Sequence, residues 1–293
     1  MIFIYKGFPI LSKKETLKEQ FKNFYNEHKP KNFEDAVEKF AIFGGVAWGK
    51  IDTSKPADEL IEKLILDDYR YIRNDITELT DGQPLYHSIL SAVAQSDGKL
   101  HAVYKRANVE EGVGEKAVAT LCERGILRQK RCKGADDKLF FTLPFLRFWF
   151  AFISPLFKGI RDGNYDEVKE RWQAHANEFA TLTFKELSWD LLRETFVEDS
   201  IMEMSEYWQN DGLTIDIYGL TKSKKRVIGL CKYTNAKVKK SELTRLQELC
   251  EKANIKADIF VIVAKKGFSS ELKALKGEQL KLYTLKNFKA LVG

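Results

Sequence analysis

The sequence predicts an α+β protein of more than one domain, with helices in its N-terminal half and an α/β domain in its C-terminal part. Three observations predict this class. Apolar residues recur at helical spacing through much of residues 34–125, whereas strand-like apolar runs follow residue 200. The length of 293 residues is enough for two domains and a small appendage. Hydrophobic residues make up 44% of the chain and charged residues 31%, which is typical of a globular protein.

The first helical region contains a stretch with the spacing of a phosphate-binding loop. Residues 43–51, "FGGVAWGKI", show the pattern G-x-x-x-x-G-K. Such a loop follows a buried strand and ends in a hydroxyl that binds magnesium. Here the preceding residues 34–42 have helical spacing, and Ile51 stands at the hydroxyl position. We therefore expect a helix that ends at the two glycines, and no nucleotide bound there.

The next region has the element order of a winged helix-turn-helix. Three short helices are expected over residues 84–95, 99–108 and 114–125, with Gly125 ending the third in a left-handed cap. Two strand-like runs follow, joined by the turn "KGADD". Three helices and a two-stranded wing define this motif. Its cations that suit a phosphate backbone are Lys116, Arg128, Lys130 and Arg131.

An aromatic run, "FLRFWFAFISPLF" over residues 145–157, is too short to cross a membrane and is expected to be buried. The chain has no apolar run of 18 residues and no recognisable signal peptide. We therefore expect a cytoplasmic protein without a membrane partner.

The C-terminal part changes from helices to strands. Residues 165–196 are expected to form two amphipathic helices, followed by strands over 201–209, 214–220 and 226–233. A helix over 239–254 then leads to a further strand over 257–264. A hairpin followed by a strand-helix-strand unit indicates an α/β domain.

Two residues of this part have the spacing of a nuclease site. Asp216 lies on one expected strand and Lys232 on the next, which is the plan of the PD-(D/E)XK nucleases. Their chemistry needs two carboxylates to hold Mg²⁺ and a lysine to act on the attacking water. Leu230 stands where the second carboxylate belongs, so Asp216 alone predicts weak Mg²⁺ binding at most. Glu186, Asp190 and Glu194 on the preceding helix are the candidates to complete the site, with Glu186 first.

Several phrases, in one order over roughly 260 residues, resemble the C-terminal portion of the archaeal-type ATPases. The phrases are "EDAVEKFAIFGGVAW", "YHSILSAVAQSDGKLHAVYKRANV", "LPFLRFWFAFISP" and "SEYWQNDGLTIDIYGL" followed by "VIGLCKY". The resemblance implies three domains. They are a helical, lid-like segment over residues 1–83, a winged helix with its aromatic linker over 84–157, and a restriction-endonuclease-like domain over 158–293.

The sequence departs from this family at the residues that matter for chemistry. Thr214 and Leu230 replace glutamates of the nuclease-like core, while Asp216 and Lys232 are kept. The helix glutamate is displaced by one position, to Glu186. The resemblance therefore implies a degenerate active site. The family's P-loop ATPase core has no counterpart in these 293 residues, so a separate ATPase is a candidate protein partner.

The net charge of +6 is concentrated at the C-terminal end, where residues 201–293 hold 18 Lys and Arg against 10 Asp and Glu. Such a basic region favours DNA as a partner. The candidate phosphate contacts there are Lys222, Lys224, Lys225, Arg226, Lys237, Lys239 and Lys240. We expect a DNA-binding protein whose cleavage activity is lost or weak. An active Mg²⁺-dependent endonuclease and a scaffold that binds a protein partner remain as alternatives.

Overall fold

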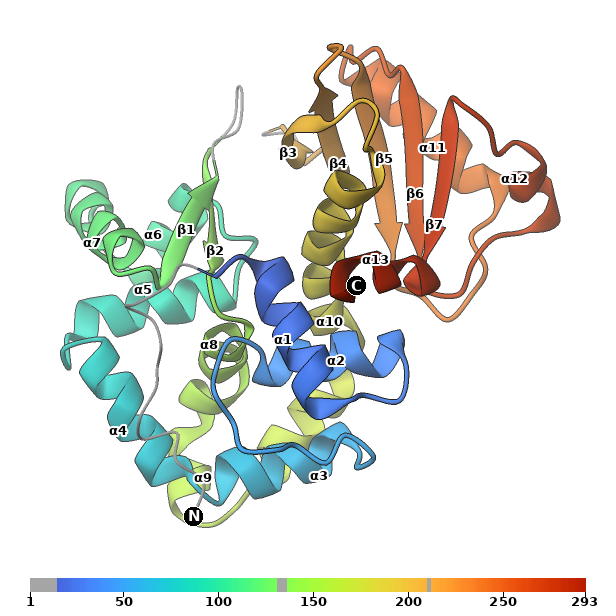
Figure 1. Ribbon diagram of the computed structural model, residues 1–293. Helices are drawn as coiled ribbons and strands as arrows, with labels where there is room; N and C mark the ends of the chain where they lie inside the picture. Colours follow the sequence, from blue (N-terminus) through green and yellow to red (C-terminus); the bar gives the residue numbers. More distant parts are fainter. Residues whose placement is uncertain (1–14, 131–135, 210–211) are drawn as a thin grey trace. The chain divides into compact units, whose positions relative to one another are not determined.

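The computed structural model describes residues 15–130, 136–209 and 212–293 (Figure 1). These residues form two compact units, and the division between them falls within two helices. The first unit contains residues 15–31, 38–130 and 136–176, and the second contains 32–37 and 177–293 apart from the two undescribed residues. The expected α+β class is confirmed, with helices in the N-terminal half and a mixed sheet in the C-terminal half. In the part of the chain that is described, no helix has both the length and the apolar character of a membrane span.

The first unit is mainly helical. Its elements are α1 (Leu17–His28), α2 (Phe33–Phe43), α3 (Ala57–Ile61), a π-helical turn (Glu62–Leu66), α4 (Tyr69–Leu79), α5 (Pro84–Ala94), α6 (Leu100–Ala107), α7 (Glu111–Glu123), β1 (Leu127–Lys130), β2 (Lys138–Phe141), α8 (Pro144–Phe148), a second π-helical turn (Trp149–Ile153), a 3₁₀ turn (Ser154–Leu156), α9 (Phe157–Arg161) and the beginning of α10 (Asp166–Thr195). The expected end of a helix at the double glycine is confirmed, because α2 stops at Phe43 and Gly45 adopts a φ of 84°.

Helices α5, α6 and α7 precede an antiparallel hairpin of β1 and β2. Gly125 ends α7 as expected, with a φ of 70°. Its amide donates to the carbonyl of Cys122 at 3.0 Å, and the Ile126 amide donates to that of Leu121 at 2.9 Å. This pair of bonds is the Schellman arrangement, which requires a left-handed residue that glycine adopts at low cost.

Most of the aromatic run is buried in the first unit, as expected from its composition, whereas Phe157, its last residue, is 41% exposed. Phe148 and Phe152 stack at 5.2 Å, and Trp172 of α10 meets both rings edge-on at 5.6 and 5.4 Å. Trp149 stacks on Tyr69 of α4 at 5.7 Å. Each such pair contributes about 0.5–1.5 kcal/mol beyond the burial of its area.

The second unit is built on a five-stranded sheet in the order β3-β4-β5-β6-β7. Its elements are β3 (Ile201–Trp208), β4 (Thr214–Thr221), β5 (Arg226–Lys232), α11 (Lys240–Lys252), β6 (Ile259–Ala264), α12 (Ser270–Ala274), β7 (Leu280–Thr284), a 3₁₀ turn (Leu285–Phe288) and α13 (Lys289–Val292). The first three strands pair antiparallel, whereas β5, β6 and β7 are parallel. The carboxyl ends of β5 and β6 therefore lie at one edge of the sheet.

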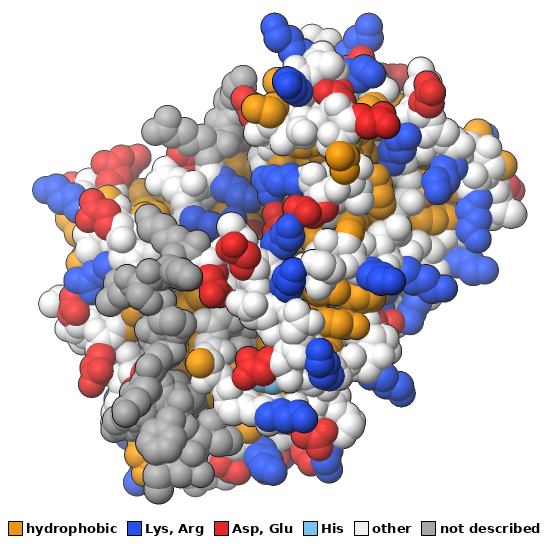
Figure 2. Space-filling view, in the orientation of Figure 1, with side chains coloured by type: hydrophobic (Ala, Val, Ile, Leu, Met, Phe, Trp, Pro, Cys, Tyr) orange, Lys and Arg blue, Asp and Glu red, His pale blue; other side chains and the backbone are white. Residues whose placement is uncertain are grey.

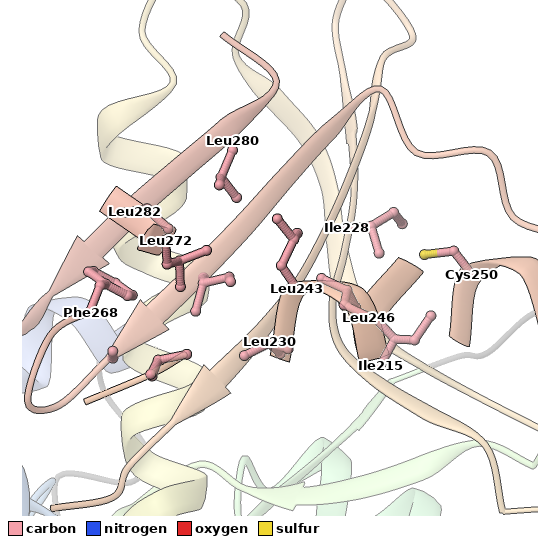
Figure 3. Packing of buried hydrophobic residues seen from close by; sticks show 13 residues of the cluster. Ile215, Ile228, Leu230, Leu243, Leu246, Cys250, Phe268, Leu272, Leu280 and Leu282 are labelled. Atoms are coloured by element: carbon pink, nitrogen blue, oxygen red, sulfur yellow. The ribbon is translucent and has the colours of Figure 1, made fainter. Parts of the chain in front are cut away.

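Helices cover both faces of this sheet. On one face, Leu243 and Leu246 of α11 and Leu272 of α12 pack on Ile228, Leu230, Ile262, Leu280 and Leu282 (Figure 3). On the other face, the C-terminal half of α10 lies against β4 and β5. Its Trp189 ring nitrogen donates a hydrogen bond to the Asp216 carbonyl, and its Ser188 hydroxyl forms a hydrogen bond with the Cys231 side chain.

The two helices expected over residues 165–196 are one continuous helix, α10, of 30 residues. That expectation was wrong because the segment contains neither glycine nor proline, which are the residues that most strongly interrupt a helix. The single helix provides residues to the cores of both units.

Candidate functional site

Polar side chains lie close together where α10 passes the first residues of β4. Asp216 lies just beyond the regular pairing of β4 with β5, which runs from Leu220–Arg226 to Ile217–Gly229. Its carboxylate Oδ2 accepts a hydrogen bond from the Cys231 amide at 3.0 Å. Its carbonyl accepts one from the Trp189 ring nitrogen at 2.8 Å. These two bonds fix the position of the aspartate between the sheet and the helix.

A buried lysine lies next to this aspartate. The Lys185 ammonium on α10 is 2.8 Å from Glu206 Oε1 on β3 and 4.0 Å from Asp216 Oδ1. The Lys185 and Glu206 side chains are 14% and 7% exposed, so the ion pair is largely removed from water. We call Lys185, Glu206 and Asp216 the ammonium–carboxylate cluster. Its opposite charges attract α10 to strands β3 and β4.

Burial and charge act in opposite directions on the pKa values of this cluster. Burial lowers the pKa of Lys185, but the carboxylates of Glu206 and Asp216 outweigh it, and the pKa lies above its ordinary value. Burial raises the pKa of Asp216, and the nearby Lys185 ammonium offsets this only in part. Lys185 is therefore charged at neutral pH.

The sequence-predicted pair of Asp216 and Lys232 lies at one edge of the sheet. The positive charge of Lys232 is close enough to offset a part of the rise that burial causes in the pKa of Asp216. The Lys232 ammonium also pairs with Glu242 Oε2 of α11 at 2.7 Å.

The third predicted residue, Glu186, is buried on α10. It follows Lys185, so its side chain points about 100° away around the helix axis. The ammonium of Lys185, and not the carboxylate of Glu186, lies beside the Asp216 carboxylate.

The cluster is a poor fit for a magnesium ion. Mg²⁺ takes oxygen ligands in octahedral geometry and usually binds through one or two carboxylates. Here an ammonium group already neutralises Glu206 and lies beside Asp216. Among the described residues, no three His, Cys, Asp or Glu side chains are grouped so that they could hold a metal ion.

Three exposed lysines lie at the same sheet edge as Lys232. Lys237 and Lys239 are on the loop after β5, and Lys240 begins α11. Backbone bonds hold this loop beside the one after β6, since the Val238 amide donates to the Gly267 carbonyl and the Ser269 amide to the Val238 carbonyl, both at 2.9 Å. We call Lys237, Lys239 and Lys240 the carboxyl-edge lysines. Figure 2 shows basic side chains over the visible surface of this unit, with acidic ones between them.

The other predicted basic residues of the sheet unit lie at the opposite end of β5. Lys222, Lys224 and Lys225 form the exposed turn between β4 and β5, and Arg226 begins β5. The seven residues of β5 separate this hairpin tip from Lys232 by roughly 20 Å, at about 3.3 Å per residue. The predicted phosphate contacts therefore form two groups.

In the first unit, the predicted cations lie on α7 and on the hairpin. Lys116 is exposed on α7. Arg128 and Lys130 both lie over the Phe140 ring, with their charged groups 5.2 and 5.1 Å from its centroid. Arg131 lies outside the described residues.

Lys185 and Glu206 were not predicted from the sequence as members of the site. The signal for Lys185 was its place after Phe184, at the position where the resembled family has its helix glutamate. Glu206 gave no comparable signal, because its role depends on how β3 pairs with β4.

Fold and site define a protein of the α+β class, with a mixed five-stranded sheet and a buried ammonium–carboxylate cluster. Residues 149–245, about a third of the chain, match the model of the DUF234 family, described as Archaea bacterial proteins of unknown function. The matched range includes Lys185, Glu206, Asp216, Lys232 and Glu242. Comparison with curated proteins and with solved structures gave no match.

Proposed function

We propose that this chain binds DNA through a nuclease-like sheet domain that has lost metal-dependent cleavage. One observation carries the proposal. The sheet edge where a PD-(D/E)XK nuclease would hold its metal has three exposed lysines, while the Lys185 ammonium pairs with Glu206 and lies beside Asp216. Such an edge can attract a phosphate backbone but lacks the ligands for a metal.

The proposed contacts are sequence-independent. Lysine ammonium groups bind phosphate oxygens as point charges, and they release counterions from the DNA. The carboxyl-edge lysines are all exposed, and their loop is held by the backbone bonds of Val238. Lys232 contributes less, because Glu242 already pairs with it.

The loss of cleavage follows from the placement of a fixed cation. A metal ion would have to displace the Lys185 ammonium from a carboxylate that is only 7% exposed. Removing a charge from a buried pair costs several kcal/mol. Leu230, at the second expected carboxylate position, belongs to the hydrophobic core and supplies no ligand.

We further infer that residues 84–143 act as a winged helix that touches DNA with its hairpin. Arg128 and Lys130 lie on the same face of the hairpin. The exposed surface of α7 carries Glu111 and Glu115 together with Lys116, so its charge is mixed. Arg124, at the end of that helix, is engaged by Asp81 and lies over the Tyr86 ring.

Fluorescence anisotropy with a labelled DNA duplex tests the sheet contact. The full chain is compared with the triple variant Lys237→Gln, Lys239→Gln, Lys240→Gln. The control variant, Lys252→Gln, Lys256→Gln, Lys276→Gln, removes the same charge from exposed positions elsewhere in the unit. Three lost phosphate contacts should reduce the slope of log affinity against log salt by about 2.7.

Each outcome has a defined meaning. A smaller slope in the first variant alone supports binding at the carboxyl edge. Equal slopes in the two variants would reject it. An absence of binding at low salt would reject DNA as the partner and would favour the scaffold alternative, in which a separate ATPase is the candidate to test first.

A further inference from the structure

The first unit contains a cavity that the proposed function does not use. Its volume is about 640 Å³, which lies within the range of small-molecule sites. The end of α1 and the residues after it provide His28, Lys29 and Lys31 as one wall, and residues 50–54 provide a second wall. The cavity lies beyond the double glycine, so its charged groups are side chains and not the backbone amides of a phosphate-binding loop.

Hydrogen bonds hold the two walls of this cavity together. The Ile51 amide donates to His28 Nδ1 at 3.2 Å, and the Thr53 hydroxyl donates to the His28 carbonyl at 3.0 Å. The Lys39 ammonium, which is buried, donates to the Thr53 carbonyl. Burial lowers the pKa of His28, so this ring is neutral and can accept the Ile51 bond at pH 7. The cavity is therefore preformed.

The lining carries an excess of positive charge. Lys29, Lys31 and Lys50 face a single carboxylate, that of Asp52. Hydrogen bonds from Ser54 lower the pKa of Asp52, so it stays ionised, and the formal charge of the lining is +2. Among the described residues, the ammonium groups of Lys29 and Lys50 form no hydrogen bond and no ion pair.

We infer that this cavity binds a small phosphorylated ligand. Several ammonium groups around one cavity match an anion with more than one negative charge, and lysine binds phosphate as a point charge. The size of the cavity fits a metabolite, and its preformed walls reduce the entropy lost on binding. The lining offers Ile51 as its apolar side chain, so recognition rests on charge.

Titration calorimetry of the full chain with pyrophosphate, at low salt, tests the inference. Lys50→Gln and Lys29→Gln are each expected to weaken pyrophosphate binding about tenfold, because each removes a charge-assisted hydrogen bond. The control is Lys55→Gln, since Lys55 is exposed, pairs with Glu59 and does not line the cavity. It should leave the affinity unchanged. Thermal melts of the three variants show that each is folded.

Three results would overturn the inference. The first is an absence of binding at millimolar pyrophosphate. The second is binding that all three substitutions leave unchanged, which would place the ligand elsewhere. The third comes from the same variants titrated with DNA. If Lys29→Gln and Lys50→Gln weaken DNA binding while pyrophosphate does not bind, the cavity takes a backbone phosphate and not a small ligand. The sheet variants of the DNA experiment leave this cavity intact, so the two proposals can fail separately.

Discussion

Replacement of Lys185 by methionine tests the ammonium–carboxylate cluster directly. Methionine keeps most of the volume of the side chain and removes its charge. The Glu206 carboxylate then loses an ammonium at 2.8 Å, and Asp216 loses one at 4.0 Å. We expect the variant to unfold more easily, because a buried carboxylate that loses its partner keeps its cost of desolvation.

The size of the expected loss of stability depends on how exposed the three side chains are. Removal of one partner from a buried ion pair costs about 3–5 kcal/mol. Glu206 is 7% exposed, so most of this cost applies to it, whereas Asp216 is 32% exposed and can regain water. We therefore expect the lower end of the range, about 3 kcal/mol.

Urea denaturation of the variant, followed by circular dichroism, measures the loss. Lys222→Met is the matched control, since Lys222 is exposed at the hairpin tip. The double variant Lys185→Met, Glu206→Gln removes both charges and should recover part of the loss. A loss for Lys185→Met below about 1 kcal/mol, the value of a surface pair, would show that this ion pair contributes no more than an exposed one.

Three further substitutions, with Gly49→Ala as a control, have expected effects on stability. Asp216→Asn should flatten the dependence of stability on pH in acidic solution. Burial raises the pKa of Asp216, so the stabilisation from its protonated form is present below the ordinary carboxyl pKa and is lost as pH rises through the raised pKa. Urea denaturation at a series of pH values measures this change. Gly229→Ala should lower the free energy of unfolding by about 3 kcal/mol, because the new Cβ would lie 2.3 Å from the Val261 carbonyl oxygen. Gly49→Ala is the control: no atom lies within 4 Å of its new Cβ, so this variant should unfold at the same temperature as the wild type. Gly125→Ala should cost about 1–2 kcal/mol in thermal melts, since its φ is 70°.

The helical half could be predicted from the sequence, because its signals are local. Pro84 begins α5 and Gly125 ends α7, as their backbone preferences require. Helix α1 was not predicted, although Thr16 and Glu19 form a capping box at its start. Strand β7 was missed as well. It has only five residues, and lysine interrupts its apolar pattern.

The site could be predicted only in part. The spacing of Asp216 and Lys232 was enough to place them on adjacent strands at one sheet edge. The ion pair of Lys185 with Glu206 joins residues from a helix and from a strand outside that pair. Whether two such residues meet depends on the rotation of α10 and on the irregular register of β3, which local periodicity does not encode.

Incubation of the chain with supercoiled plasmid, in Mg²⁺, in Mn²⁺ or in EDTA, separates DNA binding from DNA cleavage. One gel shows both retardation and nicking. We expect the plasmid to be retarded in all three conditions and to stay intact. Metal-dependent nicking that Asp216→Ala and Lys232→Ala both abolish would contradict this expectation, and would show that the cluster around Lys185 still supports cleavage.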